Sequence, residues 1–164
     1  MRLEVHHKIG KNVCCQLKES GFHVNEKLFL LGNLFPDLIH SYIWCRHEYQ
    51  YSREYVREKL DKLKKTSRFF SFHLGVLTHY ICDYFCYPHS VNYDKGLVQH
   101  IFYEIRQKVP KNFYKTRLNI TNFAIEELDK LVRCYEIFRR SCDNDESDFH
   151  IAAMVASSFL QAAY

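Results

Sequence analysis

Residues 79–104 read HYICDYFCYPHSVNYDKGLVQHIFYE, and each end of this stretch places a carboxylate four residues after a histidine. His79 precedes Asp83 by four positions, and His100 precedes Glu104 by the same interval. On an α-helix, side chains four residues apart lie on one face with their Cβ atoms about 5–6 Å apart. The stretch therefore predicts two helical segments, each presenting an imidazole and a carboxylate on the same side.

The sequence on both sides of this stretch has helical periodicity. Apolar residues recur at three- and four-residue spacing over 54–64 and 122–139, and a last helix is expected over 147–163. No run alternates apolar and polar residues over six or more positions, as a half-buried strand would. Turn-forming residues predict breaks between helices at 20–21, 32–37, 90–96 and 110–112. We expect an all-α fold of about six helices.

Composition limits the class of protein. The 164 residues, 47% of them hydrophobic, predict one domain over 1–164 and exclude a disordered chain. No apolar run approaches the roughly 20 residues that span a bilayer, and the first residues lack the apolar core of a secretory signal. Seven cysteines is an odd number, which favours reduced thiols in a cytoplasmic protein.

Five potential metal ligands lie within the opening stretch, because His89 stands between the two histidine–carboxylate pairs. A single such pair is usually a hydrogen-bonded surface or core pair, but two pairs with a further histidine between them favour a metal site. Zinc suits the set, since imidazole nitrogen and carboxylate oxygen are its normal ligands besides thiolate. Two metals about 3.5–4 Å apart can hold a phosphate ester and activate a water for in-line attack.

The spacing H-x3-D-x5-H, a variable gap and H-x3-E resembles the zinc-dependent phospholipase C family, which shares its all-helical fold with the S1/P1-type nucleases. Upstream, residues 31–37 (LGNLFPD) resemble the family's glycine-to-Pro-Asp segment, whose Asp binds metal. Residues 6–10 (HHKIG) resemble the early histidine of bacterial members. The similarity covers roughly residues 1–110, while the last third matches only in being helical.

The resemblance implies three zinc sites. Their expected ligands are His89, His100 and Glu104 for the first, His47, His79 and Asp83 for the second, and His6 and Asp37 for the third. Secreted members also bind zinc through the amino group and carbonyl of an N-terminal Trp. This chain begins with Met1 and carries its tryptophan at Trp44, so we expect two or three zinc ions, with the third site the weakest.

Several of these assignments have alternatives. His40 and His73 compete with His47, although a helical His73 would be turned about 120° from the face of His79. His7 competes with His6.

Asp37 and Cys86 also have two interpretations each. Asp37 follows Pro36, so it either begins a helix as an N-terminal carboxylate or binds metal and acts as a general base. Cys86 lies seven residues after His79 and is more easily explained as a small buried neighbour than as a ligand.

The resemblance predicts a zinc-dependent phosphodiester hydrolase of phospholipase C type, with Asp37 assisting the attacking water and phospholipid as substrate. An S1/P1-type nuclease and a non-catalytic metal-binding helical protein are the alternatives. Nucleic acid is a less favoured partner than lipid. The basic run 57–68 is usually a solvated helix face, but it could also attract an anionic membrane surface.

Overall fold

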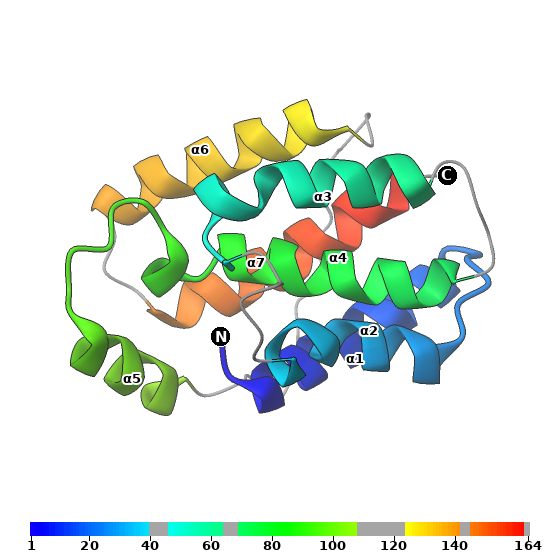
Figure 1. The fold of residues 1–164 in the computed structure, drawn as a ribbon, viewed down its shortest axis with the longest axis horizontal. Coiled ribbons are helices and arrows are strands. Elements are labelled where there is room, and N and C mark those ends of the chain that lie inside the picture. The colour runs from blue at the N-terminus through cyan, green and yellow to red at the C-terminus, as the bar shows by residue number, and fades with distance from the viewer. Residues whose placement is uncertain (40–45, 64–68, 108–123, 142–144, 163–164) are drawn as a thin grey trace.

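A computed structural model describes residues 1–39, 46–63, 69–107, 124–141 and 145–162. Within these ranges the chain forms helices and no strand, so the predicted all-α fold is confirmed (Figure 1). The helices are α1 (Leu3–Glu19), α2 (Glu26–Leu38), α3 (Tyr49–Leu63), α4 (Phe70–Tyr84), the short 3-10 helix η1 (Tyr87–His89), α5 (Leu97–Arg106), α6 (Ile125–Ser141) and α7 (Asp145–Gln161).

Helix α4 forms the centre of the molecule. Its sequence, FSFHLGVLTHYICDY, carries no charged Asp, Glu, Lys or Arg before Asp83, and nearly every residue from Leu74 to Tyr84 is fully buried. A helix that is apolar on all sides must be covered on all sides. Helices α1, α2, α3 and α7 pack against it, and Figure 1 shows α3 running beside it.

The packing of α2 on α4 depends on a glycine in each helix. A Cβ atom at Gly32 of α2 would lie 2.0 Å from the carbonyl oxygen of Phe72, and one at Gly75 of α4 would lie 2.0 Å from that of Phe29. Both distances are far inside van der Waals contact, so the two backbones meet where side chains are absent. This contact fixes the position of α2 relative to the histidine-bearing face of α4.

The break predicted at 32–37 is wrong, because α2 continues through these residues and ends at Leu38. Pro36 lies inside the helix and is buried. A proline here removes only the hydrogen bond to the carbonyl of Gly32, and the packing of α2 against α4 compensates for that loss. Asp37 therefore lies in the last turn of α2, and the expectation that it begins a helix is also wrong.

The other predicted segments correspond to helices with shifted ends. The described parts of the segments 54–64, 122–139 and 147–163 correspond to α3, α6 and α7, and breaks occur as expected at 20–21 and 90–96. The described part of the chain holds seven α-helices rather than about six. The predicted break at 110–112 lies outside the described residues.

Two further features bear on the class of protein. In the described ranges, no helix combines the length and the apolar character that crossing a membrane requires. The described cysteines are free thiols.

We expect Gly75→Ala to lower the free energy of unfolding by about 1–3 kcal/mol, the usual cost of overpacking a tight core. Alanine favours a helix over glycine, so any loss must come from the close approach to Phe29. Gly96→Ala is the matched control, because its Cβ would meet nothing nearer than the Gln99 side chain at 3.8 Å. Urea unfolding followed by circular dichroism measures both, and equal stability of the two variants would contradict the packing interpretation.

Candidate metal centre

Asp83, in the last turn of α4, is a fully buried carboxylate surrounded by histidines. Its Oδ2 lies 2.8 Å from Nδ1 of His47 and 3.3 Å from Nε2 of His79, and these two nitrogens are 3.4 Å apart. Its Oδ1 lies 3.2 Å from Nε2 of His6 on α1. A tetrahedral ion with bonds of about 2.0–2.2 Å separates its ligand atoms by about 3.4 Å. The spacing of these atoms is close to that requirement.

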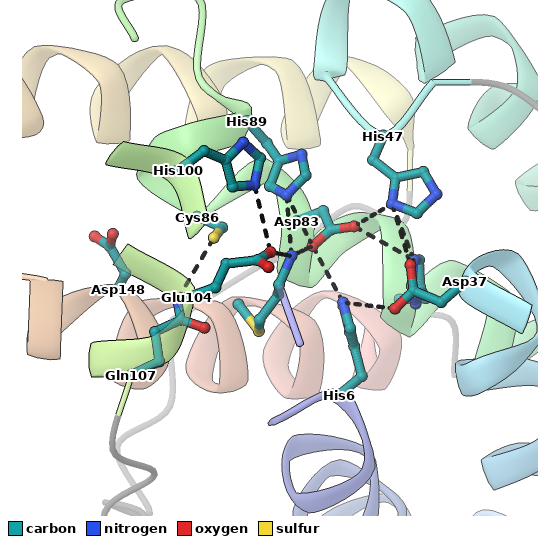
Figure 2. Close-up of polar contacts among 12 residues, drawn as sticks. His6, Asp37, His47, Asp83, Cys86, His89, His100, Glu104, Gln107 and Asp148 are labelled. Atoms are coloured by element: carbon teal, nitrogen blue, oxygen red, sulfur yellow. Dashed lines mark hydrogen bonds and ion pairs between the residues drawn. The ribbon is translucent and has the colours of Figure 1, made fainter. Parts of the chain in front are cut away.

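A second group of potential ligands adjoins Asp83. Nε2 of His100 lies 3.3 Å from Oε1 of Glu104, as their four-residue spacing on α5 predicts. His89, at the end of η1, packs its ring against that of His100 with the centroids 5.2 Å apart. Nε2 of His89 is also 3.8 Å from Oδ1 of Asp83, so the two groups form one continuous cluster (Figure 2).

Asp37 approaches the same cluster from the end of α2. Its Oδ1 lies 3.7 Å from Nδ1 of His47 and 3.7 Å from Nε2 of His79, and its Oδ2 lies 4.0 Å from Nε2 of His6. The carboxylate keeps 20% of its surface exposed, unlike Asp83. Burial nevertheless raises the pKa of Asp37 above its ordinary value.

The amino group of Met1 lies between the two groups of ligands. It donates to Oδ1 of Asp83 at 3.1 Å, and it lies 2.9 Å from Nε2 of His89 and 3.2 Å from Oε1 of Glu104. Burial opposes its charge, but Asp83, Cys86 and Glu104 together raise the pKa of this amino group to about 12. A positive charge is therefore stabilised at the point where the carboxylates of α4 and α5 meet.

The orientation of His79 is set by α2. Nδ1 of His79 lies 2.9 Å from the backbone carbonyl of Asn33, which can only accept, so Nδ1 carries the proton. In the neutral ring the lone pair of Nε2 then points at Asp83 and Asp37. Asn33 is itself fully buried and donates through Nδ2 to the carbonyl of His6 at 2.6 Å. One residue of α2 thus places a histidine from α1 and another from α4.

Several groups in the cluster have the ionisation states of metal ligands. His47 is an exception, because burial opposes its charge but the hydrogen bond with Asp83 and the charges of Asp83 and Asp37 raise its pKa. Burial lowers the pKa of His6 to about 3 and that of His89 well below its usual value, so both rings are neutral. Burial opposes ionisation of Glu104, but the hydrogen bond with His100 and the Met1 amino group lower its pKa to about 2. Burial likewise opposes ionisation of Asp83, while Met1 and the surrounding imidazoles hold its pKa well below the ordinary value.

These residues fit zinc. Imidazole nitrogens and carboxylate oxygens face one another, and a cation would separate and satisfy them. Both ring nitrogens of His6 are buried and make no hydrogen bond within the described residues. Three groups bring their ligand atoms within 4.8 Å of one another: His6, His79 and Asp83; Asp37, His47 and His79; and His89, His100 and Glu104.

The structure brings together all eight residues predicted from the sequence, and their role as ligands stays a prediction. The first expected set, His89, His100 and Glu104, is one of the three groups. The other two groups share His79, and both differ from the predicted sets, because His6 joins Asp83 and His47 joins Asp37. The predicted set of His47, His79 and Asp83 is nonetheless as compact as these.

The alternative ligands considered from the sequence lie either away from this cluster or outside the described residues. His40 and Trp44 lie outside them. Burial, with smaller contributions from Lys59 and Lys62, lowers the pKa of His73, and this residue joins no ligand group among the described residues. His7 is only partly buried, whereas His6 is fully buried in the cluster.

Cys86 lies beside the cluster rather than in it. Its Sγ lies 3.9 Å from the Tyr103 hydroxyl and 3.7 Å from the Gln107 side chain. Burial raises the pKa of its thiol to about 12, so it is protonated at neutral pH. This agrees with the interpretation of Cys86 as a buried neighbour.

Sequence reasoning missed a second buried carboxylate, Asp148 of α7. Its Oδ2 accepts from the hydroxyl of Tyr103 on α5 and from the backbone N–H of Tyr87 in η1, at 3.2 Å for the latter. Its Oδ1 lies 3.5 Å from Nε of Arg139, which is also buried. Because Tyr103 is the buried residue of α5, this contact anchors the helix that carries His100 and Glu104. The sequence offered no signal for it, since Asp148 has no partner at helical spacing.

We therefore expect Asp148→Asn to weaken zinc binding by the group of His89, His100 and Glu104. Asparagine replaces one carboxylate oxygen by an amide that donates, so it cannot accept from all the donors that face it. Loss of a residue that orients metal ligands costs about 10–100-fold in affinity. Competition with a chromophoric chelator measures zinc affinity of the folded variant, and circular dichroism verifies that it is folded.

Asp129→Asn is the control for this prediction. Asp129 of α6 accepts from Tyr49 and from Arg53 of α3, so it makes the same kind of tyrosine–carboxylate–arginine contact away from η1 and α5. We expect this control to lose stability and keep the zinc affinity of the His89 group. If Asp148→Asn also keeps the zinc affinity of the His89 group, Asp148 only stabilises the fold.

Comparison with known proteins assigns the chain to a family. Searches of curated proteins and of solved structures return no match. The model of one family, described as zinc dependent phospholipase C, matches residues 5–150 and so includes all eight candidate ligands, from His6 to Glu104. On this match, the chain belongs to the zinc-dependent phospholipase C family.

Proposed function

We propose that this protein is a zinc-dependent phosphodiester hydrolase that cleaves phospholipids in the manner of a phospholipase C. One observation supports the proposal above all others. Seven imidazole and carboxylate side chains from α1, α2, α4, α5, η1 and the residues before α3 converge on an eighth, the buried Asp83. Family membership supports the proposed reaction class and a phospholipid substrate. The number of zinc ions, two or three, stays part of the proposal.

The ligand set favours catalytic metal chemistry over a structural metal. Structural zinc sites are usually closed by four protein ligands that are rich in cysteine, whereas catalytic sites leave a position open. The three groups here are built from histidine and carboxylate, and the thiol of Cys86 is outside them. When bound, zinc would stabilise charge on the phosphoryl oxygens and make a water more acidic.

Within this proposal, the histidines and the carboxylates of the cluster have different roles. Burial lowers the pKa values of His6 and His89 and keeps both rings neutral, and the backbone carbonyl of Asn33 orients the ring of His79 toward the cluster. Asp83 and Glu104 supply negative charge that offsets the cations.

Asp37 is the residue we propose as general base. It is the most exposed carboxylate that faces both His47 and His79, so water can reach its Oδ atoms. Its raised pKa brings it closer to neutrality, which favours proton transfer from an attacking water.

A substrate panel tests the proposal. We expect zinc-loaded protein to hydrolyse a monomeric short-chain phosphatidylcholine faster than bis-p-nitrophenyl phosphate or single-stranded DNA, and to lose that activity on chelation. Faster cleavage of DNA would favour the nuclease alternative instead. Elemental analysis that finds zinc, without turnover of any of the three substrates, would favour a non-catalytic binding protein.

Asp37→Asn tests the proposed base. The change preserves volume but removes the charge, so we expect phosphodiester hydrolysis to fall by about 10²-fold or more. Asp61→Asn, on the exposed side of α3, is the control and should keep full activity. Zinc content measured on the same samples separates loss of a base, with zinc retained, from loss of a ligand. Full activity and full zinc content in Asp37→Asn would exclude both roles.

A further inference from the structure

Helix α5 turns its apolar side outward. Most of its large apolar residues are between 49% and 74% exposed, and they form one stripe, here called the outer face of α5: Leu97, Val98, Ile101, Phe102 and Ile105. Val91, in the turn before the helix, is 56% exposed. A surface helix in water normally points such a stripe at the core. Five large apolar side chains on ten residues form a patch of the kind that marks an interaction surface.

The opposite side of α5 faces the metal centre. His100 and Glu104 turn toward His89 and Asp83 (Figure 2). Tyr103, between them in the sequence, donates to Asp148. A helix with its side chains is about 10–12 Å across. The outer face therefore lies one helix diameter from the ligands. Figure 1 shows α5 at a corner of the molecule, apart from α3 and α4, where a flat surface can reach it.

We propose that the outer face of α5 docks on a phospholipid surface and brings the metal centre to the headgroups. This inference rests on the proposed function, because a lipid substrate resides in such a surface. Docking through α5 would place the ligand groups close to the phosphodiester that they are proposed to cleave. No other occupant of the face, a second copy of this chain included, would bring substrate and metal centre together in this way.

The charges around the face agree with a lipid surface. Arg106, in the last turn of the helix, is exposed and flanks the apolar stripe. Before the helix, Lys95 and Asp94 are exposed too, and Nζ of Lys95 lies 5.6 Å from the ring centroid of Tyr87. The acid within α5, Glu104, turns inward. Apolar side chains that enter the acyl boundary, flanked by cations at headgroup level, are the pattern of an interfacial helix.

The basic run 57–68 offers a competing surface for anionic lipid. On α3, Arg57 pairs with Glu54, and Lys62 lies 4.0 Å from Glu58, so part of its charge is balanced locally. Lys64, Lys65 and Arg68 lie outside the described residues. Helix α3 also carries none of the three ligand groups. Of these two surfaces, the outer face of α5 is therefore better placed to bring lipid to the metal centre.

The test compares two double variants. Val98→Gln with Phe102→Gln removes apolar area from the outer face, at positions four residues apart on α5. Leu28→Gln with Leu31→Gln is the matched control, because both leucines are exposed and belong to the first half of α2, which begins on the side of the molecule away from α5 (Figure 1). Glutamine is a good helix former, so both variants should keep their helicity. If the α5 pair fails to fold, the single change Ile105→Gln replaces it.

Binding is measured by flotation with vesicles of a phosphonate analogue of phosphatidylcholine, whose carbon–phosphorus bond resists cleavage, with and without added anionic lipid. We expect the α5 variant to bind at least about tenfold more weakly than wild type, since two large apolar side chains no longer enter the lipid. The control should bind like wild type. Hydrolysis of a monomeric short-chain phosphatidylcholine should be unchanged in both, because neither pair touches the ligand groups.

Three results would overturn the docking proposal. They are wild-type protein that does not bind the vesicles, an α5 variant that binds as tightly as wild type, and a loss of binding matched by the control. Analytical ultracentrifugation adds a fourth: a dimer that dissociates in the α5 variant, with vesicle binding unchanged, would assign the face to a second copy. Failure of the proposed function appears separately, as absent hydrolysis of the monomeric substrate with vesicle binding intact.

Discussion

The close packing of α2 on α4 is the contact on which the metal centre depends. Gly32 and Gly75 let the backbones meet, and Gly10 leaves room for the side chain of Asn33 against α1. At this distance the backbone carbonyl of Asn33 accepts from the ring of His79, and the side-chain amide of Asn33 donates to the backbone carbonyl of His6. A Cβ atom at either α2–α4 glycine would push the helices apart and separate these partners. The ligand positions thus follow from backbone packing rather than from the ligands themselves.

The cluster itself is a concentration of polar groups that burial alone would disfavour. Isolated charges such as Asp83 are costly to bury, and they persist only with compensating partners. Here the partners are the Met1 amino group and several imidazoles, which hold the pKa of Asp83 below its ordinary value although burial opposes this. The same burial keeps His6 and His89 neutral. For Asp83, His6 and His89, opposite responses of acid and imidazole to one environment yield the protonation states that suit a divalent metal, whereas the pKa values of Asp37 and His47 are raised.

The ligands on α4 and those on α5 differ in how deeply their helices are buried. His79 and Asp83 belong to the buried central helix, whereas His100 and Glu104 belong to α5, whose burial is limited to Tyr103. The buried pair of Asp148 and Arg139 from α7 and α6 connects that tyrosine to the rest of the fold. Helices remote in sequence therefore contribute to the site by holding α5, although they carry none of its ligand groups.

The sequence alone determined the helical class and the pairing of His79 with Asp83 and of His100 with Glu104, because contacts at four-residue spacing are local properties of a helix. It also indicated His89 and, through resemblance to the family, His6, His47 and Asp37. The path of α2 through Pro36 was not predicted, since tertiary packing outweighed a local preference. Contacts between distant segments likewise decide which ligands group together, since His6 lies next to Asp83 and Asp37 next to His47. The same holds for the hydrogen bond from Asn33 to His6 and for that from Tyr103 to Asp148. Such contacts leave no periodicity in the sequence, because they are fixed only when the helices pack at a particular distance and angle.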